Sequence, residues 1–246
     1  MSKTSADVAI NGMISLDRRH AKSYNIIIWH IIEGSDNMKY HKLTENAVKP
    51  DGFWGKLMIR SMNKGHSELT DWALTHFPIR SGSVVLDVGC GGGKTVGKLC
   101  DMVGSGKVYG IDYSGLCVKK AENLNRKNVL CNRAVIRQAS VSSLPFEDEK
   151  FDAVTAVETY YFWPDKLGDL REIGRVLKRG GRLLLVFEML ADPDDPEKWK
   201  AVEKRLNIEA VTREGIEEML DRAGYQNIRT YVRSGTTWLC ATAEKE

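Results

Sequence analysis

Disulfide and zinc chemistry have little support in this sequence. Only five of its 246 residues are cysteine, and no two of them form a Cys-x-x-Cys pair. The five are Cys90, Cys100, Cys117, Cys131 and Cys240. An odd, scattered set argues against a disulfide framework and against structural zinc, and it favours a reducing compartment. No His-x-x-x-His pair or mixed Cys and His cluster is present either, so we expect a cytoplasmic protein without a metal site.

Long apolar runs are also missing. The most hydrophobic segment, residues 24–32, is far shorter than the roughly 20 residues that a membrane-spanning helix needs. The polar residues 33–36 that follow it make a poor signal-peptide cleavage site. We therefore expect no secretion signal and no stable insertion into a membrane.

An excess of one charge is absent as well. The chain has 36 basic and 33 acidic residues, which leaves a net charge of +3 at neutral pH. The Lys and Arg residues do not cluster along one face, as a protein that tracks nucleic-acid phosphates requires. The hydrophobic fraction of 42% and the charged fraction of 28% are ordinary for a globular protein. Nucleic acid is not an expected partner, and the composition leaves the oligomeric state open.

Residues 85–96 contain a cluster of glycines between a predicted strand and a predicted helix. An apolar run ends in Asp87 and then breaks into a turn that contains Gly89, Gly91 and Gly93. A helical pattern follows from Lys94. Strand, glycine turn and helix is the arrangement by which an α/β protein presents backbone N–H groups to a nucleotide-like ligand.

Counting separates three kinds of glycine turn. A P-loop requires a first glycine where this chain has Val88, so that motif is one residue short. A dinucleotide-binding turn requires its third glycine where this chain has Lys94, whose side chain would crowd the packing of helix on strand. The pattern that remains is Asp-x-Gly-x-Gly-x-Gly, beginning at Asp87.

A second acidic residue supports an adenosine-type ligand. Residues 107–112 read as the next strand, and this strand ends in Asp112, about 20 residues after the glycine turn. A carboxylate at the tip of the neighbouring strand can accept both ribose hydroxyls. A solvated Asp at a strand end is the alternative for this residue taken alone.

Strands and helices alternate through the middle of the chain. A helix is expected over 66–77, closed by Pro78, and Gly180-Gly181 is expected to end the helix over 165–178. The remaining expected elements are strands 83–88, 107–112, 133–138, 151–157 and 182–188, and helices 94–103, 114–127, 197–206 and 212–223. Runs 225–232 and 236–243 should form an antiparallel hairpin. We expect an α/β fold, with residues 50–246 as one domain and residues 1–49 as an N-terminal extension.

Several motifs in this order resemble the class I S-adenosylmethionine (SAM) dependent methyltransferases, and in particular the UbiE-like enzymes that act on small molecules. Besides the glycine turn, the resemblance includes 138–140 followed by Leu-Pro-Phe at 144–146, the strand start at 151–154, and the Leu-Lys-Arg-Gly-Gly turn at 177–181. The resemblance implies a doubly wound, seven-stranded, mostly parallel sheet with a C-terminal antiparallel hairpin. It also implies SAM as cofactor and transfer of its methyl group to a small-molecule acceptor.

The same resemblance implies a set of cofactor-binding residues. They are Asp87, Gly89, Cys90, Gly91, Asp112, Tyr113, Ser140, Val141, Glu158 and His66. Ser140 stands where the family has an acidic residue that accepts the adenine amino group. A serine still accepts this hydrogen bond, without the added strength of a charge, so adenine binding would rest more on the main chain of Val141.

Four aromatic residues in a row, at 160–163, follow the fourth strand directly after Glu158 and Thr159. Ligands bind at this edge of a parallel sheet, so we expect some of the rings to line the acceptor pocket and others to pack helix against sheet. Glu158 and Tyr160 are the candidate catalytic residues, with Glu158 as a general base if the acceptor is a hydroxyl or an amine. Glu158 could equally bind cofactor or hold its loop.

The class of the methyl acceptor is indicated only by sequence motifs that the chain lacks. The fourth strand is not followed by the Asn/Asp-Pro-Pro-aromatic sequence of amino-methylating DNA enzymes, and no Pro-Cys pair is present. A small-molecule acceptor is therefore favoured, with O, N, C or S as the methylated atom. Two alternatives remain, a SAM-binding protein without transfer activity and a nucleotide-dependent reductase on a similar sheet.

Overall fold

A single seven-stranded sheet organises the described part of the chain, residues 66–246 of a computed structural model. The strand order is β3-β2-β1-β4-β5-β7-β6. The strands are β1 (Val84–Val88), β2 (Lys107–Asp112), β3 (Ala134–Gln138), β4 (Phe151–Val157), β5 (Leu177–Phe187), β6 (Tyr225–Val232) and β7 (Leu239–Lys245). The first five run parallel and β7 is antiparallel to both β5 and β6. The predicted sheet and its C-terminal hairpin are confirmed.

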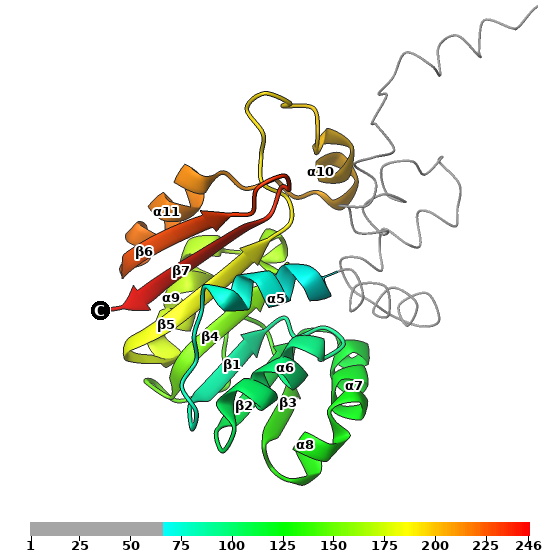
Figure 1. The fold of residues 1–246 in the computed structure, drawn as a ribbon, viewed down its shortest axis with the longest axis vertical. Coiled ribbons are helices and arrows are strands. Elements are labelled where there is room, and N and C mark those ends of the chain that lie inside the picture. The colour runs from blue at the N-terminus through cyan, green and yellow to red at the C-terminus, as the bar shows by residue number, and fades with distance from the viewer. Residues whose placement is uncertain (1–65) are drawn as a thin grey trace, which may run out of the picture.

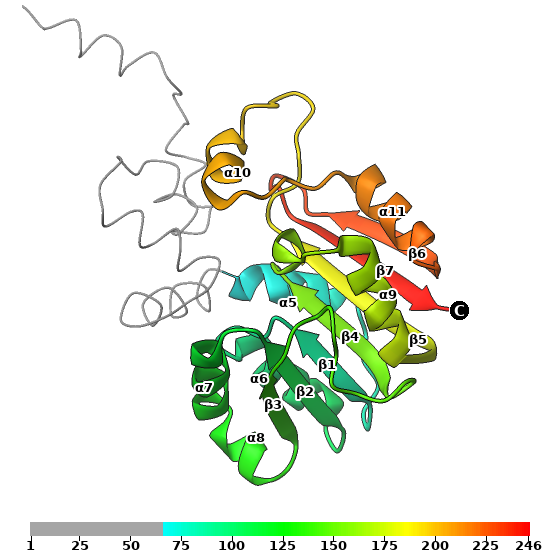
Figure 2. The ribbon, with the colours of Figure 1, turned by 180° about the vertical axis from the view of Figure 1, so that it is seen from behind.

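Helices cover both faces of this sheet. The helices of residues 66–246 are α5 (Ser67–Thr75), α6 (Lys94–Val103), α7 (Gly115–Leu124), α8 (Arg126–Leu130), the short 3-10 helix η1 (Tyr160–Phe162), α9 (Lys166–Val176), α10 (Lys200–Leu206), which lies beyond the edge of the sheet, and α11 (Arg213–Arg222). Figure 1 shows α5 and α6 in front of the sheet, and Figure 2 shows α9 and α11 against the opposite face. This is the three-layer arrangement that alternating strands and helices predict.

The central strands are buried because helices lie on both sides of them. β1 is an almost uninterrupted apolar run, and Val85 and Leu86 are fully inaccessible to solvent. β1 lies between β2 and β4, so its last residues reach the middle of the sheet's carboxyl edge. The point where the strand order turns from β1 to β4 is where doubly wound proteins bind ligands.

Predicted boundaries were wrong at the start of β5. α9 ends at Val176, and Gly180-Gly181 lie inside β5 instead of ending a helix. The pairing with β4 explains this, because Phe151 pairs with Leu177 but Ala153, two residues later, pairs with Arg182. The extra residues of β5 form a bulge in which Gly180 has φ +68°. The glycines therefore serve a bulge, which periodicity alone does not reveal.

Smaller boundary shifts have local causes. The helix expected over 114–127 is divided at Asn125, whose side-chain N–H groups donate to the carbonyls of Gly93 and Ala121. α5 ends at Thr75, before Pro78. The hairpin turn is longer than expected, because β7 begins at Leu239 instead of at residue 236. The backbone N–H of Arg233 donates to the carbonyl of Trp238 across this turn. Predictions for residues 1–65, including the 1–49 extension, lie outside the described residues.

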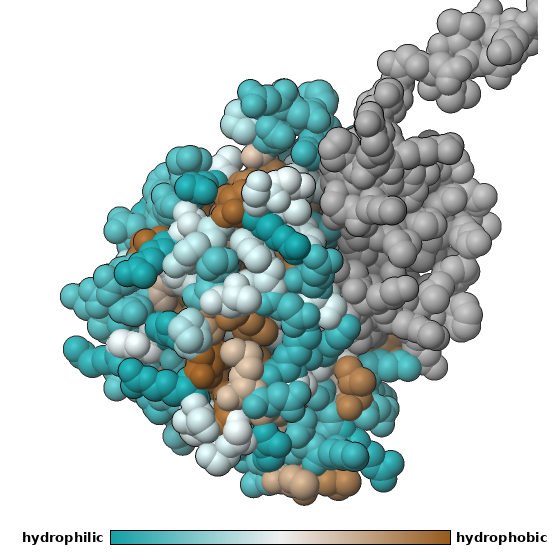
Figure 3. All heavy atoms as spheres, in the orientation of Figure 1, coloured by the Kyte–Doolittle hydropathy of each residue, from teal (hydrophilic) through white to brown (hydrophobic). Residues whose placement is uncertain are grey.

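Within residues 66–246, no helix combines the length and apolar character needed to cross a membrane. The face of the described region seen in Figure 3 is mostly hydrophilic, with small separate apolar patches. This surface is that of an ordinary globular domain.

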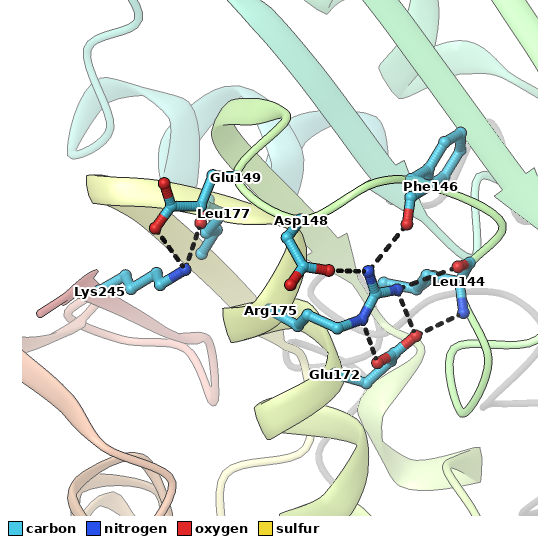
Figure 4. A network of polar contacts seen from close by, with 8 residues as sticks. All are labelled: Leu144, Phe146, Asp148, Glu149, Glu172, Arg175, Leu177 and Lys245. Carbon is cyan, nitrogen blue, oxygen red and sulfur yellow. Dashed lines mark hydrogen bonds and ion pairs between the residues drawn. The ribbon is translucent and has the colours of Figure 1, made fainter.

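One arginine holds the loop between β3 and β4 to the rest of the domain. Arg175, near the end of α9, donates to the carbonyl oxygens of Leu144 and Phe146 and to the carboxylates of Glu172 and Asp148 (Figure 4). Glu172 in turn accepts the backbone N–H of Leu144. The Leu-Pro-Phe turn is thereby fixed against α9 through two of its carbonyls and one N–H.

Replacing Arg175 by Met should lower the free energy of unfolding by about 2 kcal/mol, because two loop carbonyls and the Glu172 carboxylate lose their donor while the apolar stem is kept. Urea denaturation followed by circular dichroism measures this change. Arg179→Met is the matched control, since the Arg179 side chain is 82% exposed. Equal stability of the two variants would contradict the role of Arg175 in fixing the Leu-Pro-Phe turn against α9.

Candidate functional site

A cavity of about 320 Å³ opens at the carboxyl ends of β1, β2 and β4. Its walls include the turn after β1 and the tip of β2. From these segments come Asp87, Gly89, Cys90, Gly91, Asp112 and Tyr113. The turn after β3 contributes Ser140 and Val141, the segment after β4 contributes Glu158, and the residue before α5 contributes His66. All ten residues expected to bind the cofactor therefore line one cavity.

The glycine turn is built from residues with left-handed backbone conformations. Gly89, Gly91 and Gly93 have φ values of +69°, +52° and +80°. A Cβ on Gly89 would lie 2.3 Å from Cγ2 of Thr159, and one on Gly93 would lie 2.7 Å from Cα of Ala121. A Cβ on Gly91 would contact no described atom within 4 Å. Gly89 and Gly93 are thus required by packing, whereas Gly91 borders open space in the cavity wall.

Asp112 holds this turn in place. Its carboxylate accepts the backbone N–H of Gly91 at 2.9 Å and the backbone N–H of Ser114 at 2.8 Å. It therefore joins the glycine turn to the tip of β2 and the start of α7. Burial raises the pKa of this carboxyl, and the two N–H bonds act in the opposite direction. The Cys117 thiol also contacts this carboxylate, and the lone pairs that remain can accept hydroxyls of a ligand in the cavity.

Asp87 is buried at the end of β1, with only one of its oxygens bonded. Oδ1 accepts the hydroxyl of Thr155 at 2.7 Å, whereas Oδ2 has no hydrogen-bond partner among the described residues. Burial raises the pKa of Asp87 to about 7, the Thr155 bond lowers it, and the charge of Asp112 raises it further. A buried carboxylate oxygen without a partner beside a cavity fits a ligand that brings a donor, such as an ammonium group.

Glu158 has a backbone conformation that is unusual for a residue with a side chain, at φ +59°. Its N–H donates to the carbonyl of Val186 on β5, and its Oε1 accepts the backbone N–H of Glu188 at 2.5 Å. The hydroxyl of Tyr161 lies 3.5 Å from the same oxygen. Burial raises the pKa of Glu158 well above its usual range, and the nearby Glu188 carboxylate adds to the effect. Strained residues of this kind cluster at functional sites.

His66 stands immediately before α5 and faces the end of β5. Its Nε2 lies 3.7 Å from Oε2 of Glu188. Burial lowers the pKa of His66 to about 4, which outweighs the attraction of the carboxylate, so at neutral pH the imidazole is uncharged. Lys98 of α6 donates to the backbone and side chain of Ser67 and to Asp71, which ties α5 to α6 beside the cavity.

The four aromatic residues after β4 divide between packing and the cavity. Tyr160 is buried against Trp163 and Phe187 and is not among the residues that line the cavity. Phe162 and Trp163 do line it. The structure thus gives the candidate catalytic residue Tyr160 no direct access to a ligand in this cavity, because its ring points into the core.

The sequence patterns also missed residues that the structure places at the site. Lys94, Thr95 and Lys98 of α6 line the cavity as well. Glu188 was missed because it follows a buried strand without any motif of its own. It comes next to Glu158 through the parallel pairing of β4 with β5, which the sequence could have suggested only once the strand order was known.

His66, Glu158 and Glu188 together place one nitrogen and two carboxylate oxygens within 4.8 Å of one another. The sequence predicted no metal site because no two of these residues are close in the chain. Only the packing of α5 and the pairing of β4 with β5 bring the three side chains to one place.

Comparison with known proteins agrees with the fold. The pattern of the family described as "Methyltransferase domain" matches residues 86–185. The 27-O-demethylrifamycin SV methyltransferase of Amycolatopsis mediterranei is 32% identical over 134 residues, which are 54% of this chain and 48% of the relative. The demethylmenaquinone methyltransferase of Lactiplantibacillus plantarum is 32% identical over 132 residues, 53% of this chain and 55% of the relative. The match thus spans about half the length of these relatives.

Solved structures share the architecture at lower sequence identity. A SAM-dependent methyltransferase from Aquifex aeolicus superposes with a TM-score of 0.61 at 23% identity, covering 76% of this chain and 97% of that one. The [4+2]-cyclase SpnF superposes with a TM-score of 0.63 at 20% identity, covering 84% and 93%. These likenesses concern the fold, which serves more than one kind of reaction.

The roles of Gly89 and Gly91 can be separated by mutation. Gly89→Ala should lower the free energy of unfolding by about 2 to 4 kcal/mol, because it combines a left-handed alanine with a collision against Thr159. Gly91→Ala should cost only about 1 to 2 kcal/mol, since it has the conformational penalty alone. Urea denaturation of both variants checks this. In the double variant Gly89→Ala/Thr159→Ala part of the loss should be recovered, and strictly additive losses would refute the collision.

Proposed function

We propose that this protein, whose residues 86–185 match the "Methyltransferase domain" family, is a class I SAM-dependent methyltransferase that transfers the methyl group of SAM to a small-molecule acceptor. The observation that carries the proposal is the cavity at the β1/β4 crossing, where a buried carboxylate oxygen of Asp87 has no described partner. Gly91, in the same cavity wall, has no side chain, and this leaves the space open.

Different cavity residues would contact different parts of the cofactor. Asp87 would accept from the amino group, and Asp112 would accept from the ribose hydroxyls while it continues to hold Gly91 and Ser114. Ser140 and the backbone of Val141 would contact the adenine. Gly89, Cys90 and Tyr113 would shape the walls. Cofactor recognition thus combines two buried carboxylates with main-chain groups.

The chemistry demands little beyond alignment. When bound, SAM supplies an electrophilic methyl group on a positively charged sulfur, and an acceptor atom must lie in line behind it. Glu158, Phe162 and Trp163 form the part of the wall that follows β4 and would position the acceptor. In its ionised form, the Glu158 carboxylate is the candidate to receive a proton from a hydroxyl or amine acceptor, because it lies in the wall where the acceptor would bind. Tyr160 would act on the site only through packing.

A small-molecule acceptor and a cytoplasmic location are also part of this proposal. The cavity, of about 320 Å³, has the size of a small-molecule site and is lined by residues from several elements, which favours a small acceptor over a nucleic acid. Buried free cysteines at positions 90, 100, 117 and 240 favour the cytoplasm. The acceptor and its methylated atom are left open.

Binding of SAM without methyl transfer is the second candidate, and the shared fold of the cyclase SpnF favours considering it. Both candidates need the same cofactor contacts, so only turnover separates them. A reductase is the weaker alternative, since Lys94 stands at the place of the third glycine of a dinucleotide turn.

Isothermal titration calorimetry should show binding of S-adenosylhomocysteine and no binding of NADH. Gly91→Ala should weaken S-adenosylhomocysteine at least about tenfold, because its methyl group enters the cavity, a loss of about 1.4 kcal/mol or more. Gly180→Ala is the matched control. Like Gly91, Gly180 has a positive φ, of +68°, and an added Cβ would meet no described atom within 4 Å. Unlike Gly91, it does not line the cavity. Absence of S-adenosylhomocysteine binding at millimolar concentration would overturn the proposed function.

Affinity for S-adenosylhomocysteine should fall as the pH drops below 7. Asp87 has its pKa raised to about 7, so at lower pH it is protonated in the free protein and must lose that proton to pair with the ligand's ammonium group. The dissociation constant should rise by about tenfold per pH unit between pH 6.5 and 5.5. Asp87→Asn should bind more weakly at pH 8 and lose this dependence, whereas Asp221→Asn on the surface of α11 should keep it. If the affinity of Asp87→Asn for S-adenosylhomocysteine still depended steeply on pH, a group other than Asp87 would be responsible for the pH dependence.

A further inference from the structure

We propose that His66, Glu158 and Glu188 form a binding site for a divalent transition-metal ion, with manganese, iron, cobalt and zinc as the fitting class. The three residues come from three separate segments, namely the start of α5, the turn after β4 and the residue after β5. Their nitrogen and carboxylate oxygen atoms all lie within 4.8 Å of one another. The three donors are therefore close enough for one ion to reach all of them once the side chains close around it.

The two carboxylate donors are buried and held in place, and the His66 side chain is 17% exposed, which distinguishes the group from an exposed acidic patch. Glu158 is 9% and Glu188 3% exposed. The Oε1 atom of Glu158 accepts the N–H of Glu188, and its backbone N–H donates to Val186. Tyr161 places its hydroxyl between Glu158 and the N–H of Met189. Such hydrogen bonds behind the ligand atoms are the outer-shell support that metal sites require.

The kind of donor decides the kind of ion. One imidazole nitrogen with two carboxylates suits manganese, iron, cobalt or zinc, whereas calcium and magnesium prefer sites made only of oxygen. Nε2 of His66 faces the carboxylates, at 3.7 Å from Oε2 of Glu188.

Three protein ligands leave coordination positions open. Two of the three, His66 and Glu158, line the cavity, so the open positions would face it next to Phe162 and Trp163. An ion there would bind an acceptor through an oxygen atom, such as a hydroxyl or carboxylate, and hold it near the transferred methyl group. Glu158 would then serve as a ligand of the ion and not as the proton acceptor, because the ion lowers the basicity of a carboxylate that binds it. This narrowing of the acceptor class rests on the proposed function, whereas the metal site itself does not.

The test uses full-length, tag-free protein freed of metal with a chelator and then dialysed. Titration with Co²⁺, followed by its visible absorption, and calorimetry with Mn²⁺ and Zn²⁺ should each show one ion per chain. Glu188→Gln should weaken binding at least about tenfold. It is the decisive variant because Glu188 does not line the cavity and binding of S-adenosylhomocysteine should be kept, which also reports that the variant is folded.

Two matched controls separate the site from general loss of charge or of histidine. Glu218→Gln removes a surface carboxylate of α11, and His76→Asn removes a histidine at the end of the same helix α5. Both should bind the ions as the unchanged protein does. Absence of binding of all three ions at millimolar concentration, or equal affinity in Glu188→Gln, would overturn the proposed site. Titration of the metal-free protein with S-adenosylhomocysteine tests the proposed function separately, so the two failures are distinguishable.

Discussion

The carboxylate of Asp112 is the interaction on which the geometry of the site depends. It accepts one backbone N–H from the glycine turn after β1 and one from the start of α7 after β2. These two segments come from neighbouring strands, and the carboxylate fixes the distance between them. Because Gly91 is held in this way, its open side can border the cavity without the turn collapsing into it.

The same edge of the sheet gathers buried acidic side chains at a cost in stability. Asp87, Asp112, Glu158 and Glu188 are all nearly inaccessible to solvent. Burial raises the pKa of the first three, which means that their ionised forms are disfavoured in the folded protein. Groups of this kind are retained where a ligand supplies the compensating donors or charge, and here they surround one cavity.

Much of the fold could be predicted from local patterns. The glycine turn, the acidic residue at the tip of β2 and the alternation of strands and helices each involve residues that are close in the chain. The hairpin of β6 and β7 was likewise confirmed, because two short runs with a brief linker have few ways to pair. The bulge at Gly180 was missed because Gly-Gly is typical of a helix end as well as of a bulge, and only the pairing with β4 separates them. Within the candidate site, nine of the ten expected residues line the cavity because the carboxyl ends of parallel strands must meet at one edge of the sheet, whereas His66 reaches it from the start of α5. Tyr160 differs from its neighbour Phe162 only in the direction that η1 gives its ring, and sequence does not encode that direction within a run of four aromatics.

The sequence by itself determined the class of fold and the turn that a cofactor requires, since glycine conformations and strand periodicity are set within a few residues. The tertiary structure alone decided which side chains share the cavity wall. His66, Glu158 and Glu188 meet there although they are far apart in the chain, because α5 lies across the sheet and β4 pairs with β5. Contacts of this kind depend on how whole elements pack, and no local pattern carries them.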